Sequence, residues 1–597
     1  MPFQVSPGIV VTEQDLTTVV PNVATTIGAM AGAFQWGPVL ERTQISTEND
    51  LVNTFGKPDD TTKCHFWTGA NFLAYSNNLI VTRVVGTAAM NATAGKAAAE
   101  YGDNVLVKNE DHYDSLTITG DTLWIAKYPG TLGNSLKIMA IDGYGWAKTG
   151  MTGAAAANQT IFTSNFDRAP GTSTDWLAAN GNTGNGYDEM HVIVIDEDGQ
   201  WTGTPGYVLE KHAFISKASD GKRIDGSSSY VKDVMKNESQ YGWLGEVGLL
   251  TSDSTDAGTT VAAGSSKIGN VFKRFNHATD AKTMPGNSLG AGTAGLGIDD
   301  NAVTTGQLQA GYALYITPEV VDITLVLGGP GASATDTTTG RYIVDSITST
   351  RKDCVAFLSP PLNDVVNNPG GEVAALTTTN TAYGSSSYAV MDSAWKYQYD
   401  RYRDVFFYCP MNGDIAGLCA RTDFTNDAWW SPAGLTRGAV KNIVKLSWEA
   451  TKANRDTMYP LSINPLITQK GAGVVLWGDK TMQVVPSAFD RINVRRLFIV
   501  LEKAISIAAK AMLFEFNDEF TRSQFVNMVE PFLREVQGRR GITDFKVVCD
   551  TSNNTGQVID TNNFVGDIYI KPNRSINYIQ LNFIAARTDV SFSEIGG

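Results

Sequence analysis

The sequence predicts a multidomain α+β (mixed α/β) protein with an α/β core, inserted β-rich outer domains and extended arms at both ends. Three observations support this fold class. The chain has 597 residues, whereas one domain usually takes about 100 to 200. Hydrophobic residues make up 42% and aromatic residues 10% of it, which is enough for several ordered cores. Helical and strand patterns alternate near both ends, and turn residues dominate the middle.

The N-terminal part divides into an arm and a first core segment. Residues 1–22 are predicted to form the arm, since a short apolar run follows a Pro-Gly turn and then gives way to polar residues. Residues 23–86 form the core α/β segment. Ser46-Thr47 followed by Asp50 indicates a helix start, a second helix is expected over 63–75, and the apolar run 79–85 favours a buried strand.

The middle, residues 87–350, is predicted to hold inserted β-rich or mixed outer domains. Short strands are expected at 191–195 and 322–327. Stretches of mostly Gly, Ala, Ser, Thr and Asp bury too little apolar surface to order themselves, so we expect exposed loops there; they are 251–266, 285–297 and 331–340. Residues 351–435 are expected to return to the core.

The C-terminal third, residues 436–574, is predicted to be an α/β domain, followed by an arm at 575–597. Apolar residues recur at three- and four-residue spacing over 497–512 and 525–536, which indicates two amphipathic helices. The GRRG turn at 538–541 ends the second helix. Strands are expected at 545–549, 564–570 and 576–585.

Charge and cysteine content narrow the possible partners and the cellular compartment. The net charge of −14 disfavours direct binding to nucleic acid. The most apolar stretch, 497–514, contains Glu502, Lys503 and Lys510, so stable membrane insertion is not expected. No secretory signal is expected at the N-terminus. Five cysteines without a CxxC pair are typical of a reducing cytosol.

A search for catalytic or cofactor motifs finds only partial matches. In GVVLWGDKT (473–481) Asp479 separates the last Gly from Lys480, which breaks the phosphate-binding pattern, so a strand and turn are favoured. GNSLG (286–290) lacks the strand and helix of a nucleophile elbow. DEDG (196–199) is better explained as a hairpin turn than as a calcium loop. The five histidines show no metal or triad spacing. We therefore predict no catalytic residue, metal or cofactor, although paired carboxylates of a hydrolase stay possible.

One segment differs in charge from the rest of the chain. Residues 491–546 contain ten basic and seven acidic side chains, a net charge of +3 (10 − 7) in a chain of −14. The segment could face an acidic partner. An ordinary solvated helical surface explains it equally well.

Several motifs at both ends of the chain resemble one protein family. They are SPGIVVTEQD (6–15), QWGP (35–38), TQIST (43–47), DLVNTFGKP (50–58), VTRVV (81–85), WGDKT (477–481), RINVRRL (491–497), VVCDTSNNT (547–555) and IYIKPNRSINYIQLNF (568–583). Together they resemble the contractile tail sheath proteins of T-even-type myophages. The middle, roughly 87–430, carries fewer matches, apart from YPGTLGN (128–134) and DEDGQWTGTPGYVLE (196–210).

The resemblance implies a structural, non-enzymatic function. Subunits would form a homo-oligomer of stacked hexameric rings along a helix, around a tail tube, with baseplate and tail terminator proteins as further partners. The sheath would be assembled in the host cytoplasm, become part of the virion, and contract by rigid-body rearrangement of its subunits, driving the tube through the host envelope for genome ejection. A phage-tail polysaccharide hydrolase and a capsid-type shell protein are the alternatives.

The resemblance also assigns roles to residues of the arms. Strands of each arm would pair with neighbouring subunits, since an unpaired edge strand invites a partner's strand. The arm residues are Val5, Ile9, Val11, Ile579, Leu581 and Phe583. The hinge residues are Pro21, Lys571, Pro572, Asn573 and Arg574, where Pro572 cannot donate a ladder hydrogen bond. The tube-facing candidates are Arg522, Arg534, Arg539 and Arg540.

Overall fold

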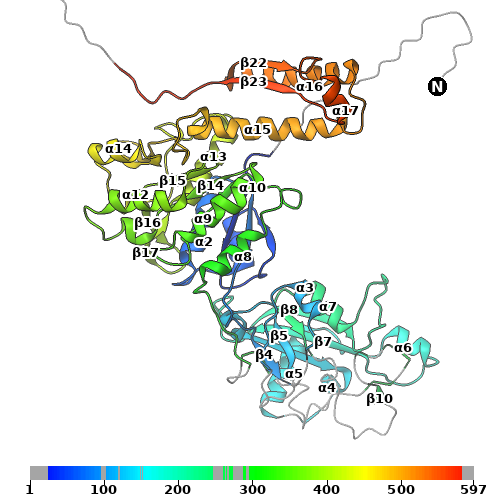
Figure 1. The fold of residues 1–597 in the computed structure, drawn as a ribbon. Helices are drawn as coiled ribbons and strands as arrows, with labels where there is room; N and C mark the ends of the chain where they lie inside the picture. Colours follow the sequence, from blue (N-terminus) through cyan, green and yellow to red (C-terminus); the bar gives the residue numbers. More distant parts are fainter. Residues whose placement is uncertain are drawn as a thin grey trace, which may run out of the picture.

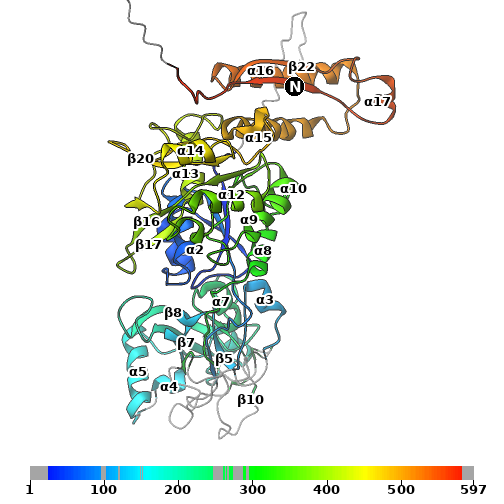
Figure 2. The ribbon, with the colours of Figure 1, turned by 60° about the vertical axis from the view of Figure 1, so that its left-hand side comes forward.

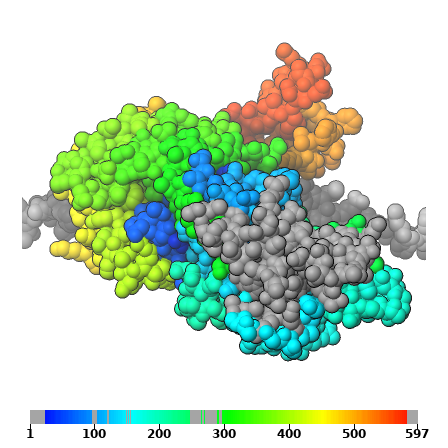
Figure 3. Space-filling model, turned by 90° about the horizontal axis from the view of Figure 1, so that it is seen from below, coloured from blue at the N-terminus to red at the C-terminus, as the bar shows by residue number. Residues whose placement is uncertain are grey.

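A computed structural model shows the fold as three parts along one axis (Figure 1). It describes residues 24–580 except 96–102, 119–121, 148, 151, 246–259, 262–263, 265, 267, 270, 273–286 and 291–294. The α/β core lies in the middle, the inserted domain at one end and a C-terminal layer at the other. Seen from the inserted-domain end, the core and the C-terminal layer lie behind that domain and the core extends beyond it on one side (Figure 3).

The core is built on a seven-stranded sheet in the order β19-β15-β14-β13-β1-β3-β2. All neighbouring pairs are parallel except the last, where β2 runs antiparallel to β3 at the edge. The strands are β1 (Gly28–Gly32), β2 (Arg42–Ile45), β3 (Leu79–Arg83), β13 (Leu325–Leu327), β14 (Val355–Leu358), β15 (Ala389–Asp392) and β19 (Ile463–Asn464).

Helices cover both faces of this sheet, so its strands are apolar on both sides. Successive side chains of a strand point to opposite faces. Accordingly Leu325 and Leu327 join one apolar cluster, whereas Val326 joins the other. The first face packs on α2 (Lys63–Leu73) and α13 (Asn412–Thr425). The second packs on α8 (Thr305–Ala313), η3 (Ile343–Thr348) and α12 (Glu372–Tyr383).

The first core segment follows the sequence prediction closely. Helix α1 (Glu48–Phe55) begins after Thr47, whose side chain accepts a hydrogen bond from the Asp50 amide while the Asp50 carboxylate accepts one from the Thr47 amide. This reciprocal cap satisfies two otherwise free amides. The helix predicted over 63–75 is α2, and the strand predicted over 79–85 is β3.

The chain returns to the core earlier than the expected limit at residue 350. Strand β13 lies between β1 and β14, and helix α8 packs beside β1. The strand predicted at 322–327 is therefore a central strand of the core and does not belong to the insertion. At the other limit, β19 at Ile463–Asn464 still pairs with β15, so the core extends past residue 435. The apolar run at 325–327 indicates a buried strand, but it does not indicate to which sheet the strand belongs.

The inserted domain contains two antiparallel sheets and short helices, as the prediction of a mixed domain implies. One sheet has the order β12-β6-β7-β8 and the other β4-β5-β9. The strands are β4 (Thr93–Gly95), β5 (Thr122–Ala126), β6 (Leu136–Asp142), β7 (Glu189–Asp196), β8 (Tyr207–Ser216), β9 (Gly242–Leu244) and β12 (Asn287–Ser288); the helices include α3 (Glu110–Ser115), α5 (Gly153–Asn165), α6 (Thr174–Ala179) and α7 (Val231–Glu238).

The C-terminal layer consists of two long helices and a hairpin-like pair of strands (Figures 1 and 2). The predicted helices are α15 (Ile492–Ala509), extended by η5 (Lys510–Met512), and α16 (Glu519–Gly538). Their apolar stripes meet in one cluster. Strands β22 (Ile542–Val548) and β23 (Asp567–Pro572) pair antiparallel, with α17 (Gly556–Asp560) between them. Over 576–580 the chain forms no strand, and 581–585 lies outside the described residues.

Candidate functional site: the anchor of the C-terminal segment

The motifs that only partly match known sites have structural explanations. Residues 473–476 form β21, which pairs with β20 (Leu466–Gln469), as the expected strand implies. The turn of this hairpin, at 470–472, precedes β21, and 477–479 form no turn. DEDG lies in the connection between β7 and β8, where the Asp196 carboxylate accepts hydrogen bonds from Ser135 and Thr202. In GNSLG, Asn287 and Ser288 form the edge strand β12. Within the described ranges, no cluster of three or more His, Cys, Asp or Glu side chains is placed to hold a metal, and no helix is long and apolar enough to span a membrane.

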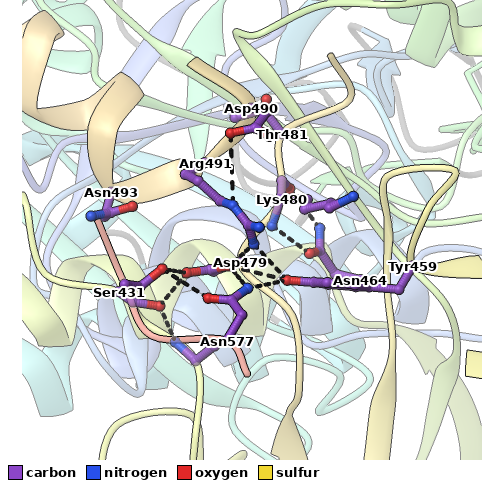
Figure 4. Close-up of polar contacts among 12 residues, drawn as sticks. Ser431, Tyr459, Asn464, Asp479, Lys480, Thr481, Asp490, Arg491, Asn493 and Asn577 are labelled. Atoms are coloured by element: carbon purple, nitrogen blue, oxygen red, sulfur yellow. Dashed lines mark hydrogen bonds and ion pairs between the residues drawn. The ribbon is translucent and has the colours of Figure 1, made fainter. Parts of the chain in front are cut away.

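The most developed polar site is centred on Asp479, three residues after the end of β21 (Figure 4). Its side chain is 5% exposed. Three groups of the folded body donate to its carboxylate: the Ser431 hydroxyl at 3.0 Å, the Tyr459 hydroxyl at 3.3 Å and Nη1 of Arg491 at 2.9 Å. Arg491 precedes α15, so the carboxylate links the core to the first turn of that helix.

The C-terminal segment supplies two further donors to the same carboxylate. The Ser575 hydroxyl donates to Oδ2 at 2.6 Å, and Nδ2 of Asn577 donates to Oδ1 at 3.2 Å. Asn577 also donates to the Tyr459 hydroxyl at 2.6 Å. One buried carboxylate therefore joins the core, the start of α15 and the segment that leads to the C-terminus.

The electrostatics of this site favour an ionised carboxylate. Burial alone raises the pKa of Asp479, but the hydrogen bond from Ser575, the charge of Arg491 and the hydrogen bond from Asn577 outweigh it and hold the pKa below the ordinary 3.8. The same carboxylate and Tyr459 raise the pKa of Arg491 against its own desolvation. With five donors around it, the carboxylate acts as a structural acceptor that holds chain segments together.

A second anchor on α15 holds the other end of the described chain. Arg496 and Asp423 of α13 form a buried ion pair at 2.5 Å, each side chain 5% exposed. Nη2 of Arg496 also donates to the Thr25 carbonyl oxygen at 3.3 Å. Arg491 and Arg496 lie within about a turn and a half of each other. Both terminal segments therefore leave the folded body at the first turns of α15.

The expected hinge residues lie at the exit from the small sheet. Lys571 and Pro572 are the last residues of β23, and the chain leaves the sheet after Pro572. Lys571 forms an exposed ion pair with Asp544 at 3.0 Å. Nδ2 of Asn573 donates to the Arg540 carbonyl oxygen at 2.8 Å. Three of the four residues are thus tied to the hairpin. Arg574, next to Ser575, is exposed. The hinge at Pro21 lies outside the described residues.

The predicted arm residues fall into two groups. Ile579 is 77% exposed, and its neighbours Ile576 and Tyr578 are each 82% exposed. Polar Ser575 and Asn577 are thus anchored, while the apolar side chains around them face solvent. The other predicted arm residues, Val5, Ile9, Val11, Leu581 and Phe583, lie outside the described residues.

The four predicted tube-facing arginines differ in exposure and do not form one surface. Arg522 is only 8% exposed and donates to Oδ1 of Asn517 at 3.2 Å, so its guanidinium stabilises the fold and is withdrawn from any partner. The side chains of Arg534 and Arg539 are 72% and 52% exposed and pair with acids of the same chain. Arg540 lies over the Trp430 ring, 5.4 Å from its centre. The helical period places residues on faces, but burial of Arg522 depends on the loop that packs over it.

In the sequence alone, Asp479 stands out only because it breaks a phosphate-binding pattern, and nothing there predicts the anchor. Ser431, Tyr459 and Asn577 gave no recognisable pattern, because they come from distant parts of the chain. One signal was present: Asp479 lies in WGDKT and Arg491 in RINVRRL, two of the motifs on which the family resemblance rests.

Comparisons with known proteins agree with the architecture. Three family models match: the phage tail sheath protein central domain over 302–482, the phage tail sheath C-terminal domain over 484–586, and the tail sheath protein Gp18 domain III N-terminal region over 25–84. The tail sheath protein of Vibrio phage KVP40 is 35% identical, and that of Enterobacteria phage T4 is 34% identical; each match covers 99% of both chains.

A solved structure shows the same fold at lower sequence similarity. The crystal structure of a sheath tail protein from Listeria innocua matches with a TM-score of 0.50 and 12% identity, over 92% of this chain and 96% of that one. The central family model begins at residue 302, close to the point where the chain returns to the core. The full-length matches and the three domain models show that the chain belongs to the phage tail sheath protein family.

Proposed function

We propose that this protein is the structural subunit of a contractile phage tail sheath, which polymerises around a tail tube and contracts by rearrangement of rigid subunits. The observation that carries the proposal is the exit of both terminal segments at α15, next to anchors that fix their starting points. The C-terminal segment then presents Ile576, Tyr578 and Ile579 to solvent. Burying an apolar side chain of this size contributes roughly 1.5 to 3 kcal/mol, which favours docking on another copy.

Rigid bodies joined by flexible segments suit a contractile lattice. The core sheet is covered on both faces and changes shape little, so motion between subunits falls on the segments that connect them. The hinge expected at Lys571 to Arg574 would bend at Arg574, because Lys571, Pro572 and Asn573 are tied to the hairpin, and further motion would fall beyond the residues that Asp479 and Arg496 hold to the body. A head-to-tail contact of this type propagates into a helical filament.

We propose the following partners and location on the basis of the family and of the charge distribution. Subunits form stacked hexameric rings, the tail tube lies inside, and baseplate and tail terminator proteins bind the two ends. The net charge of −14 opposes direct contact with nucleic acid. The protein assembles in the host cytoplasm, resides in the virion tail and catalyses no reaction.

The purified protein tests the central part of this proposal. Negative-stain microscopy and sedimentation should show long tubes for the complete chain, and a folded, soluble protein without tubes after deletion of residues 1–20. A hydrolase would remain a small oligomer, and a shell protein would close. Long tubes of the deletion variant would contradict the role of the N-terminal arm.

A second experiment tests the contact with the tube. Replacing Arg539 and Arg540 by Glu should weaken tube-templated assembly most strongly at low salt, where charges are screened least. Lys470→Glu, on the exposed turn between β20 and β21, serves as the control and should co-assemble like the wild type. Unchanged co-assembly at every ionic strength would assign these residues to an ordinary solvated surface.

A further inference from the structure

The connection between α15 and α16 presents an unusual group of aromatic side chains to solvent. Residues 513–520, which we name the aromatic knob, have the sequence LFEFNDEF. Phe514 and Phe516 are fully or almost fully exposed, at 104% and 81%, and Leu513 and Phe520 are 63% and 74% exposed. Clustered apolar exposure of this type is rare on a soluble monomer and marks an interaction site.

The knob is held in place by specific contacts. Nδ2 of Asn517 donates to the Asn563 carbonyl oxygen at 2.8 Å and to Oδ1 of Asn554 at 3.1 Å. Asp518 caps α16 by accepting from the Thr521 amide at 2.8 Å. Phe514 has a φ of 72°, a left-handed conformation that bulky residues adopt rarely. The backbone is therefore fixed in a shape that holds its phenylalanines away from the protein.

The knob also carries negative charge. Glu515, Asp518 and Glu519 are exposed, and within the described parts of the chain none of them forms an ion pair. No basic residue occurs between 513 and 521. A partner surface should therefore combine apolar or aromatic side chains with positive charge.

A cleft with these complementary properties lies at the opposite end of α15. Its volume is about 920 Å³, and its walls include the aromatic side chains Trp430, Tyr459 and Trp477. Trp477 is 43% exposed. The lining contains five basic residues and two acidic ones, Asp456 and Asp479. The basic residues are Arg437, Lys452, Arg455, Arg540 and Arg574.

The positive charge of the cleft is not neutralised within the chain. Asp479 is already paired with Arg491. Among the described residues, no carboxylate forms an ion pair with Lys452, Arg455 or Arg574. The cleft therefore retains a net positive charge beside the exposed indole ring of Trp477, where a carboxylate and a phenyl ring would both be accommodated.

The two surfaces of one chain cannot meet. Asn493 at the start of α15 lines the cleft, whereas the knob follows the last turns of the same helix. The 18 residues of α15 span about 27 Å at 1.5 Å per residue. Figures 1 and 2 both show α14 (Lys452–Met458), which lines the cleft, in the core below one end of the C-terminal layer, and α17, near the knob, at the other end of that layer.

We infer that the aromatic knob of one copy docks in the cleft of a second copy of this chain. The inference rests on the proposed function, because it describes one contact of the self-assembled lattice. Knob and cleft lie at opposite ends of α15, so the contact is heterologous and repeats from copy to copy. Phe514 and Phe516 enter among Trp430, Tyr459 and Trp477, while Glu515 and Glu519 face Lys452 and Arg455.

Charge reversal tests the contact in the complete chain. Glu515→Lys/Glu519→Lys and, separately, Lys452→Glu/Arg455→Glu should each lower the rate of tube formation at least tenfold at low salt. Combining the four substitutions in one chain should restore most of that rate, since opposite charges again face each other. Lys470→Glu, on the exposed turn between β20 and β21, is the control and should assemble like the wild type.

Removal of the aromatic side chains and disulfide cross-linking are two independent tests of the contact between knob and cleft. Phe514→Ser/Phe516→Ser should abolish tubes and leave the melting temperature unchanged. Phe424→Ser, at another exposed phenylalanine, should leave both tube formation and the melting temperature unchanged. Mixing Phe516→Cys and Trp477→Cys chains should yield a disulfide-linked dimer that neither variant forms alone.

The outcomes separate this contact from the proposed function. Wild-type assembly of both charge-reversed variants, without a cross-linked dimer, would overturn the contact and leave the sheath function intact. Normal self-assembly with loss of tube binding would assign the cleft to the tail tube and also overturn it. Failure of the wild-type chain to form tubes would overturn the proposed function itself.

Discussion

The core sheet and the small sheet of the C-terminal layer differ sharply in how completely they are buried. Every residue of β1 and of β14 is buried, whereas no residue of β23 is. Tyr569 of β23 is 60% exposed. The core strands complete their packing within one chain, whereas the small sheet leaves apolar side chains exposed. Under the proposed function, the first region is the rigid body of the subunit and the second is a surface that other copies cover.

The largest expected effect comes from the buried ion pair of the core. Lys396 and Asp414 lie 2.9 Å apart, with side chains 0% and 1% exposed. Asp414→Ala leaves the buried ammonium group of Lys396 without a counter-ion, with the Lys441 carbonyl oxygen as its remaining acceptor, and should lower the free energy of unfolding by about 3 to 5 kcal/mol. Chemical denaturation measures this loss.

The matching substitution in the C-terminal layer is Asp544→Ala. Asp544 pairs with Lys571, and their side chains are 60% and 74% exposed, so its loss should cost at most about 1 kcal/mol. Equal effects at the two sites would contradict the division into a closed core and an open layer.

The second prediction separates the two regions by pH. Burial lowers the pKa of His65 in the core from 6.5 to about 4. Between these values the unfolded chain takes up a proton that the folded chain excludes, so the free energy of unfolding falls as the pH falls from 6.5 to 4. The maximum loss is about 3 kcal/mol.

The His65 contribution is measured as the difference between the wild type and His65→Gln. Taking this difference cancels the opposite contribution of the buried Asp392, whose pKa burial raises to about 8. The Asp479 anchor should lose its contribution to the free energy of unfolding in another pH range. Because the pKa of Asp479 is lowered below 3.8, its contribution persists down to that pH and is lost only below it. A difference between the wild type and His65→Gln that does not change between pH 6.5 and 4 would contradict the exclusion of a proton from buried His65.

The third prediction concerns release of the C-terminal segment. Hydrogen bonds to a charged group contribute about 1.5 to 3 kcal/mol each, so Asp479→Ala should speed tryptic cleavage after Arg574 by tenfold or more. Lys571 precedes a proline and is not cleaved. The melting temperature should fall as well, because the same carboxylate joins the core to Arg491 at the start of α15, so cleavage is measured well below the melting temperature of the variant. Asp490→Ala, next to Arg491, is the control, and equal cleavage of both variants would refute the anchor.

Helices, caps and turns of the fold could be predicted wherever residues close together in sequence determine the local structure. The capping box at Thr47 and Asp50, the stripes of α15 and α16 and the hairpin turn after Asp196 all follow from residues close together in sequence. The sheet to which β13 belongs could not be predicted, because its partners β1 and β14 come from distant segments. The burial of Arg522 depends on Asn517 and its loop, which no helical period describes.

The candidate site shows the same limit. Asp479 receives donors from Ser431, Arg491 and Ser575, which are up to 144 residues apart (575 − 431), and only the folded chain brings them together. Family motifs indicated that WGDKT and RINVRRL matter, but not that they meet. The exposure of Ile579 was easier to foresee, since an alternating strand after a proline has no partner in its own sheet.

The most direct test of an incomplete C-terminal layer is to remove the exposed apolar side chains of its last described segment. Ile576→Ser/Tyr578→Ser/Ile579→Ser keeps Ser575 and Asn577, and therefore the anchor. The melting temperature of the monomer and the formation of tubes are then measured on the same preparation. We predict an unchanged melting temperature and no tubes. A substantial drop in the melting temperature, or tubes of normal length, would show that these side chains serve their own subunit and contradict a layer completed by other copies.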